Sequence, residues 1–390
     1  ASTDPGYALE RESRQDRTLW RFAKRAPKTY SITYRVESYD PYLSPEATFV
    51  SDRRAVALGY STFLVPLELS DYLPCTIRVR IDAPKSWPVW TSWQGDGSQF
   101  TPQSVHELWS GGLVAGKFKE SRLESAHCGV TVLTEDRGAA RGLNVANRLL
   151  PVIRESVELF GAAPNSKFLE VMALYRTMPM TDRKSRMMGV SENNSFFCLA
   201  TADRYQDLEQ ITLLAAHECL HFYLGGAIVP KPKPPFNNSP ELIWLIEGVT
   251  EYLAHELMVE ASVMKPARFN EIVESKRKQV KEHEYASVSL AIAAGKFNRA
   301  ETYQVVYSKG FLIAQALDQY MAEQSGEGAF DAALRDLFQT HNFNETHEWV
   351  TASEVKAIFE AHCPGAAAWI ETYAEGSVAH PNVSDASQSE

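Results

Sequence analysis

Residues Asp207–Gly226 have the sequence DLEQITLLAAHECLHFYLGG, and their pattern predicts one helix that ends at the closing glycine pair. Asp207 with Gln210 is typical of a capping pair, and apolar residues follow at helical spacing. His217 and His221 lie four positions apart inside this helix. Both side chains therefore leave the same face and can reach one metal ion.

Glu218 follows the first histidine of this H-E-x-x-H motif. It is rotated by about 100° around the helix axis, which places it beside a metal rather than on it. A general base for a metal-activated water belongs at that position. The motif is short enough to occur by chance, so two core histidines beside a surface glutamate stay an alternative.

A catalytic zinc needs a third protein ligand and one open position. Ser239 followed by Pro240 predicts the start of a second helix, with an N-cap and then proline at the first helical position. Glu247 is an acid in the apolar part of this helix, where a buried carboxylate requires a cation. We therefore expect Glu247 to be the third ligand, with a salt-bridged core glutamate as the alternative. Glu251, one turn later, either orients a ligand imidazole or faces solvent.

The remaining sequence predicts a multi-domain α+β chain. We expect a β-rich, sandwich-like N-terminal domain over 1–142, a zinc catalytic domain over 143–262, a helical C-terminal domain over 263–380 and a polar tail over 381–390. Within the first domain, residues 1–25 are charged and are expected to form a loose arm. The expected strands are Ser31–Glu37, Cys75–Ile81, Lys167–Leu174 and Ser195–Ala200, and the expected early helix is Asn144–Phe160, with a kink or a later start at Pro151.

The bulk composition narrows the class of protein. The net charge is -10, which disfavours a nucleic-acid partner because phosphate binding requires a basic surface. No apolar run is long enough to predict a membrane span. The five cysteines form no C-x-x-C pair, which excludes zinc-ribbon and dithiol redox motifs. The sequence begins at Ala1 without a methionine, so either a targeting segment was removed or the sequence is trimmed. An exported protein, periplasmic or secreted, is favoured over a cytoplasmic one.

The segment Trp244–Tyr252, WLIEGVTEY, following H-E-x-x-H, resembles the gluzincin aminopeptidases. Two branches compete: the aminopeptidase N type (M1) and the glycyl aminopeptidase type, peptidase family M61. The aminopeptidase N branch has a shorter connection between the second histidine and the glutamate than the 25 residues found here, 222–246. This longer connection contains a proline-rich stretch, 230–236, and resembles the M61 branch.

Other stretches carry the same resemblance, which spans about residues 145–380. The sequence GVSEN at 189–193 resembles the exopeptidase motif, which implies that Glu192 grips the α-amine of the substrate. The sequence YSKG at 307–310 resembles the Y-x-K-G stretch, which implies that Tyr307 donates to the oxyanion. Three features depart from the family: the segment 222–229 replaces its usual basic run, the exopeptidase motif is closer to the other branch, and the frequent C-terminal PDZ domain is not in this sequence.

The resemblance implies a thermolysin-like gluzincin catalytic domain and a zinc-dependent aminopeptidase that acts on peptides with a free N-terminus. One zinc per chain would be held by His217, His221 and Glu247, with Glu218 as general base for the zinc-activated water. Two rival functions stay open: an endopeptidase or dipeptidase on the same scaffold, and an inactive member that binds peptides. The histidines without ligand spacing are expected to be structural: His106, His127, His255, His283, His341, His347, His362 and His380.

Overall fold

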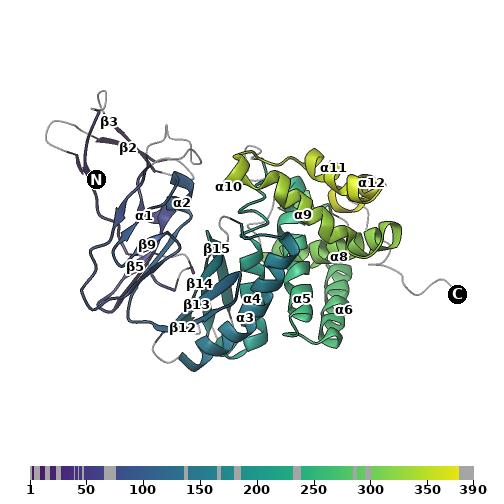
Figure 1. Cartoon of the computed structure of the whole chain (residues 1–390), viewed down its shortest axis with the longest axis horizontal. Helices are drawn as coiled ribbons and strands as arrows, with labels where there is room; N and C mark the ends of the chain where they lie inside the picture. The colour runs from purple at the N-terminus through teal and green to yellow at the C-terminus, as the bar shows by residue number, and fades with distance from the viewer. Residues whose placement is uncertain are drawn as a thin grey trace.

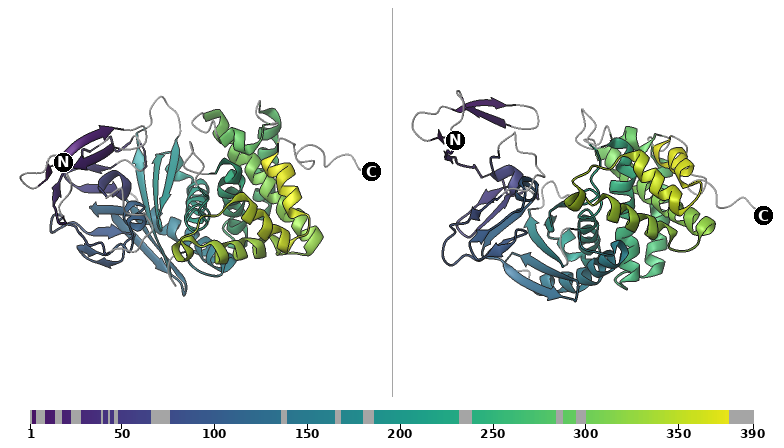
Figure 2. Two further views of the ribbon diagram at one scale, coloured as in Figure 1. Left: turned by 90° about the horizontal axis from the view of Figure 1, so that it is seen from above. Right: turned by 45° about the horizontal axis from the view of Figure 1, so that its top comes forward.

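The computed structural model shows a β-rich N-terminal part and a helical C-terminal part at opposite ends, with a five-stranded sheet between them (Figures 1 and 2). The structure describes residues 2–3, 9–13, 18–22, 28–38, 40–42, 44–45, 48–65, 76–135, 139–164, 168–179, 186–231, 239–283, 288–294 and 300–376. The expected polar tail and most of the proline-rich stretch lie outside these residues.

The N-terminal part consists of small antiparallel sheets. A four-stranded sheet has the order β5-β6-β11-β8, with strands at Phe49–Val50, Arg54–Leu58, Gly112–Gly116 and Val89–Thr91. A three-stranded sheet, β7-β10-β9, comprises Val79–Arg80, Gln99–Phe100 and Gly95–Asp96. Two short helices, α1 (Gly59–Thr62) and α2 (Val105–Trp109), accompany them.

Three expectations for this part need correction. The expected strand Cys75–Ile81 is reduced to the two residues of β7, and Cys75 lies outside the described residues. The expected loose arm over 1–25 is wrong in part, because β2 (Leu9–Ser13) and β3 (Thr18–Phe22) pair as an antiparallel hairpin. The alternating segment Ser31–Glu37 forms only a two-residue strand, β4 (Ile32–Thr33), which pairs with β1 (Ser2–Thr3). Alternation alone does not make a strand, because each strand also needs a partner of matching length.

The central sheet has the order β12-β13-β14-β16-β15. Its strands are Lys119–Glu124, Cys128–Thr134, Leu169–Met178, Ser195–Thr201 and Met187–Glu192. Strands β13, β14 and β16 run parallel and are buried on both faces, as their continuous apolar sequences favour. The edge strand β15 is antiparallel to β16. The expected domain boundary at residue 142 stays a prediction, and this sheet takes two strands from before it.

Different layers cover the two faces of this sheet. Helices α3 (Ala139–Phe160) and α4 (Leu208–Leu220) cover one face, with Val130, Val132 and Phe196 in the shared core. Pro151 lies inside α3, which is a single helix with no later start. The other face packs against the N-terminal sheet, where Phe197 belongs to a common apolar cluster with Val56 and Val114.

Arg176 on β14 joins the same two layers. Its guanidinium is buried and donates to the backbone carbonyls of Pro41 and Pro45, at 2.9 and 2.8 Å, and it also lies over the ring of Phe49. Burial lowers the pKa of Arg176 to about 10, which still leaves it charged at neutral pH. The N-terminal part is therefore held to the central sheet by a charge-assisted contact as well as by apolar packing.

The C-terminal part of the chain is helical, as expected, and it follows the central sheet. A 3₁₀ turn η2 (Pro240–Leu242), a π-helical turn η3 (Trp244–Val249) and α5 (Thr250–Glu260) form one continuous helical segment. The remaining helices are α6 (Pro266–Glu282), α7 (Leu290–Ala294), α8 (Ala300–Ser325), α9 (Ala329–His341), α10 (Phe343–Thr346), α11 (Ala352–His362) and α12 (Ala366–Ile370), with a last π-helical turn η4 (Glu371–Glu375). Among the described residues, no helix has both the length and the apolar character that crossing a bilayer requires.

Candidate metal centre

Helix α4 positions the H-E-x-x-H motif, and it ends earlier than the sequence predicts. Asp207 is the N-cap and accepts from the backbone N–H of Gln210, as expected. The last helical residue is Leu220, so His221 is the C-cap rather than an interior residue. The chain turns here because the left-handed Gly225 closes a compact loop in which the Leu224 carbonyl accepts from His221 Nδ1–H at 3.0 Å.

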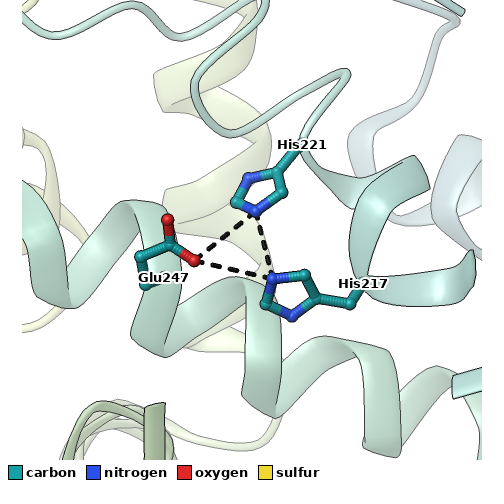
Figure 3. Close-up of side chains that lie close together, drawn as sticks. All are labelled: His217, His221 and Glu247. Carbon is teal, nitrogen blue, oxygen red and sulfur yellow. Dashed lines mark hydrogen bonds and ion pairs between the residues drawn. The ribbon is translucent and has the colours of Figure 1, made fainter. Parts of the chain in front are cut away.

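Glu247 comes from the π-helical turn η3, which crosses the end of α4. Ser239 and Pro240 begin this segment as predicted, although the Ser239 hydroxyl bonds the Lys231 carbonyl instead of capping the helix. A π-helical turn inside an α-helix is frequent at functional sites, because it re-aims the side chains that it carries. Here it carries the carboxylate that faces the two histidines (Figure 3).

Three side-chain atoms converge at this point (Figure 3). The Nε2 atoms of His217 and His221 are 3.1 Å apart, and each lies 3.5 Å from Oε2 of Glu247. Ligands bound tetrahedrally at the zinc–nitrogen distance of about 2.0–2.1 Å would lie about 3.3 Å from one another. The three observed distances between these atoms fit three of the four positions around a tetrahedral zinc ion.

The hydrogen bonds around the three atoms explain why they need a cation. His221 Nδ1 faces the Leu224 carbonyl and His217 Nδ1 faces the Glu251 carboxylate, at 3.0 and 2.9 Å. Since these oxygens only accept, the ring proton of each histidine in its neutral form lies on Nδ1, and each Nε2 then presents a lone pair. Glu247 Oε2 is buried without a hydrogen-bond partner. Three acceptors facing one another without a proton repel, and a metal ion is the group that this donor set fits.

The electrostatics of the metal-free site point the same way. Burial opposes charge on His217, but the carboxylates of Glu247 and Glu251 outweigh it and raise its pKa to about 10. Burial also opposes charge on Glu247, yet His221 and His217 hold its pKa well below the ordinary range. The pocket is therefore built to hold positive charge, which a proton supplies when no metal is bound.

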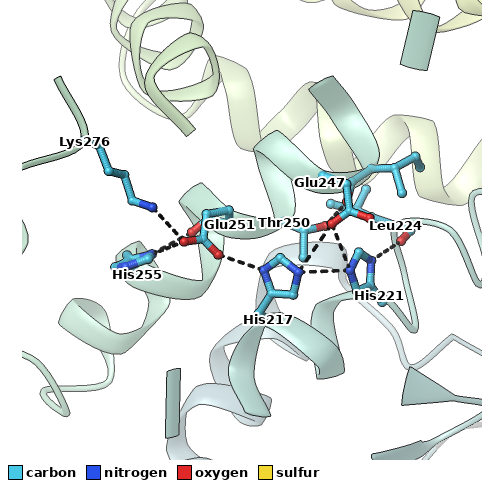
Figure 4. A network of polar contacts seen from close by, with 9 residues as sticks. His217, His221, Leu224, Glu247, Thr250, Glu251, His255 and Lys276 are labelled. Atoms are coloured by element: carbon cyan, nitrogen blue, oxygen red, sulfur yellow. Dashed lines mark hydrogen bonds and ion pairs between the residues drawn. The ribbon is translucent and has the colours of Figure 1, made fainter. Parts of the chain in front are cut away.

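Glu251 contacts His217 on the side of the ring away from the three converging atoms (Figure 4). Its Oε2 accepts from His217 Nδ1–H at 2.9 Å, and its Oε1 accepts from the Lys276 ammonium at 2.8 Å. His255 Nδ1–H donates to the Glu251 backbone carbonyl at 2.7 Å. Of the two alternatives that the sequence left open for Glu251, the structure favours the first, because its carboxylate holds the imidazole of His217.

A cavity of about 400 Å³ opens beside the three converging atoms. Glu218 lines it and is 8% exposed, close to the histidines but outside the set of three. Tyr307, from α8, also lines it, and its ring centroid lies 5.5 Å from that of His217. The lining residues are His106, Ser110, Pro164, Gly189, Val190, Ser191, Asn193, Asn194, Glu218, His221, Phe222, Leu224, Gly225, Gly226, Ile246, Glu247, Tyr307 and Asn344.

The GVSEN segment forms one wall of the cavity. It lies on the edge strand β15, which the sequence did not predict as a strand, and on a two-residue turn. Asn193 and Asn194 have positive φ there, as hairpin turns of this kind require. A Cβ on Gly189 would lie 2.8 Å from Glu218 Oε1, so glycine allows the strand to approach that carboxylate. Glu192 is the last residue of β15; its side chain lies outside the described part of the structure.

His106 and Ser110 were not predicted as site residues, yet both line the same cavity. His106 lies on α2 of the N-terminal part, and Ser110 follows this helix. No spacing rule connects them to the H-E-x-x-H motif, because they are brought to it by packing between layers. The helix is held in place by Ser104, whose hydroxyl accepts from the Glu107 N–H, and by Trp93, whose Nε1–H donates to the Glu107 carbonyl. His106 therefore lies beside the candidate site, while the expectation that it is structural stays a prediction.

A contact between two glycines brings the helix that carries Tyr307 against the turn that carries Glu247. Gly248 follows Glu247, Gly310 lies one turn after Tyr307, and a Cβ on Gly310 would lie 2.7 Å from the Gly248 Cα. Glycine at both positions is what lets α8 touch the π-helical turn backbone to backbone.

Replacing Gly310 with Ala should therefore separate these helices and move Tyr307 relative to Glu247. We expect a loss of about 1–3 kcal/mol in unfolding free energy from overpacking. A displacement of about 1 Å at a reacting group lowers kcat by about 10²-fold, which sets the upper range of the effect on activity. Thermal denaturation and kcat measure the two effects. Gly142→Ala is the matched control, since the atoms nearest its added Cβ belong to side chains, at 3.0 Å or more; equal behaviour of both variants would contradict the role of the glycine contact.

Comparisons with known proteins agree with this geometry. The M61 glycyl aminopeptidase model matches residues 210–313, and the peptidase M61 N-terminal domain model matches residues 2–116. The chain has no match among curated protein sequences.

Solved structures share the fold. An aminopeptidase N family protein from Idiomarina loihiensis is 18% identical, with a TM-score of 0.74, over 96% of this chain and 67% of that one. An M1 zinc metallopeptidase from Deinococcus radiodurans is 16% identical, with a TM-score of 0.57, over 88% and 75%. A variant of the latter, bound to a Tyr-Ser-Ala substrate, is 14% identical, with a TM-score of 0.55, over the same shares.

Proposed function

The chain belongs to the M61 glycyl aminopeptidase family of metallopeptidases, and from this premise we propose that it is a zinc-dependent aminopeptidase that removes N-terminal residues from peptides. The observation that carries the proposal is the convergence of His217, His221 and Glu247 on one point at the edge of a cavity. Two imidazoles and one carboxylate are a ligand set typical of catalytic zinc in peptidases, with a fourth position left for water or substrate.

His217, His221 and Glu247 would hold one zinc per chain. The chemistry that zinc supplies when bound is polarisation of the scissile carbonyl and activation of the attacking water. Glu218 takes the proton of that water during the attack and then passes it to the leaving amine, so that one carboxylate serves as base and as acid. Its place on the cavity wall, beside the ligands and outside their set, supports this role.

We assign to the Tyr307 hydroxyl the stabilisation of the oxyanion. Its side chain lines the cavity within ring contact of His217, so a hydroxyl donor lies on the substrate side of the metal ligands. A tetrahedral intermediate concentrates negative charge on the former carbonyl oxygen, and a preorganised O–H donor stabilises that charge more than it stabilises the neutral substrate.

Glu192 is assigned to the α-ammonium of the substrate, which would make the enzyme an exopeptidase. Support comes from the family motif and from the two neighbours of Glu192, since Ser191 on β15 and Asn193 in the following turn both line the cavity. A carboxylate at that wall would fix how many residues precede the scissile bond.

Cleavage of a peptide and of its N-acetylated counterpart tests this proposal. An aminopeptidase should cleave the free peptide from its N-terminus and leave the acetylated one intact. Equal cleavage of both would show an endopeptidase on the same scaffold. No cleavage of any free peptide by zinc-loaded protein would indicate a peptide-binding member without activity.

Zinc affinity should depend on pH with a defined sign. The metal-free His217 has a pKa raised to about 10 from an ordinary 6.5, so below pH 10 zinc must displace a proton from it. The apparent affinity should therefore rise with pH, by up to about tenfold per pH unit. Competition with a chelator at several pH values between 6.5 and 10, corrected for protonation of the chelator, measures this; an affinity independent of pH would contradict the assigned protonation.

A further inference from the structure

Lys276 is buried at a position where its helix otherwise presents apolar residues. Helix α6 buries Val273, Lys276 and Val280, which share one face, while most of its other residues are exposed or half-buried. Lys276 itself is 9% exposed, and its Nζ lies 5.0 Å from the ring centroid of Phe311 on α8. A lysine in such a place needs a strong partner, because a desolvated ammonium without one is costly.

That partner is Glu251. The Lys276 ammonium donates to Oε1 at 2.8 Å, while His217 Nδ1–H donates to Oε2 at 2.9 Å (Figure 4). Each oxygen of one carboxylate therefore has its own donor, and the two donors come from opposite sides. A carboxylate held by only one of them could rotate about its last side-chain bond, whereas two charge-assisted contacts fix its plane.

The fixed plane matters because it sets the direction of His217. The ring nitrogen that faces Glu251 carries the proton, and the opposite nitrogen is one of the three converging metal-ligand atoms. Rotation of the carboxylate would turn the ring and move Nε2 away from His221 and Glu247. Partners behind metal-ligating histidines have this general effect, and their loss typically costs about 10–100-fold in metal affinity.

We propose that Lys276 is a positioning residue of the metal centre: through Glu251 it fixes the orientation of His217 and thereby raises the affinity of the site for zinc. The inference rests on the proposed function in one respect, namely that the three converging side chains hold zinc. It goes beyond it by placing on α6, outside every motif of the sequence, a residue that the metal site needs.

The zinc dissociation constant, measured on the full chain by competition with a chelator, tests the proposal. Lys276→Met, which keeps the length and the burial of the side chain, should weaken zinc binding by about 10–100-fold. Lys276→Gln, which keeps a donor but loses the charge, should weaken it by less. Lys278→Met is the matched control, because Lys278 is exposed on the same helix and should leave the dissociation constant unchanged.

A double-mutant cycle separates positioning from a merely structural role. If Lys276 acts through Glu251, then Lys276→Met should change the zinc dissociation constant less than about twofold in a Glu251→Gln background. An equal effect of Lys276→Met in both backgrounds would overturn the proposal. So would wild-type zinc affinity in whichever of the two Lys276 variants folds, judged by circular dichroism. A wild-type chain that binds no zinc would instead refute the proposed function, which keeps the two failures distinct.

Discussion

Replacing Glu218 with Gln is expected to lower kcat by about 10²–10⁴-fold while the protein keeps its zinc. The amide has the shape of the carboxylate but cannot accept a proton from water at neutral pH. Glu218 lies on the cavity wall and not among the three converging atoms, so the metal ligands should be unaffected. Steady-state hydrolysis of an aminoacyl fluorophore, together with zinc content by elemental analysis, measures both parts of the expectation.

The matched control is Glu209→Gln, in the first turn of the same helix, where the carboxylate pairs with Arg268 and does not line the cavity. That variant should keep its kcat. Wild-type turnover in Glu218→Gln would end the assignment of Glu218 as general base, and loss of zinc from it would show that Glu218 supports the ligands instead.

Replacing His221 with Ala should abolish stoichiometric zinc binding and, with it, hydrolysis. The substitution leaves two of three ligands and removes the ring whose Nδ1–H holds the Leu224 carbonyl. The loss in zinc affinity should exceed the roughly 10–100-fold loss that follows from removing a hydrogen-bond partner of a metal-ligating side chain. Zinc content after gel filtration measures the first effect, and residual activity at saturating zinc measures the second.

His362→Ala is the control for this variant, since His362 pairs with Asp336 in the helical part and lies outside the cavity lining. It should retain full zinc content. One zinc per chain in His221→Ala would contradict the proposed ligand set, whatever its activity.

The residues of the site that follow from local sequence patterns were predictable. His217, Glu218 and His221 follow from helical spacing, and Glu247 follows from the cost of burying an acid in an apolar stretch. The expected end of α4 was wrong, because it was placed at the glycine pair. The helix already ends at Leu220, and the His221 side chain bonds the Leu224 carbonyl in the turn that follows.

The parts that depend on packing between distant segments were not predictable. His106 reaches the cavity because the N-terminal sheet lies on the back of the central sheet. Strand β15 was missed because it is an edge strand, and its pairing with β16 depends on the Asn193–Asn194 turn. Lys276 did leave a signal, a charged residue in the apolar stripe of an amphipathic helix, but its partner lies on another helix.

The proposed function depends on His217, His221 and Glu247 binding one zinc ion. Anomalous diffraction at the zinc absorption edge, from crystals of zinc-loaded protein, tests it most directly. We expect one strong peak per chain, bounded by His217 Nε2, His221 Nε2 and Glu247 Oε2 and facing the cavity that Glu218 and Tyr307 line. A zinc-saturated crystal with no peak at that point, or with its zinc held by other residues, would contradict it.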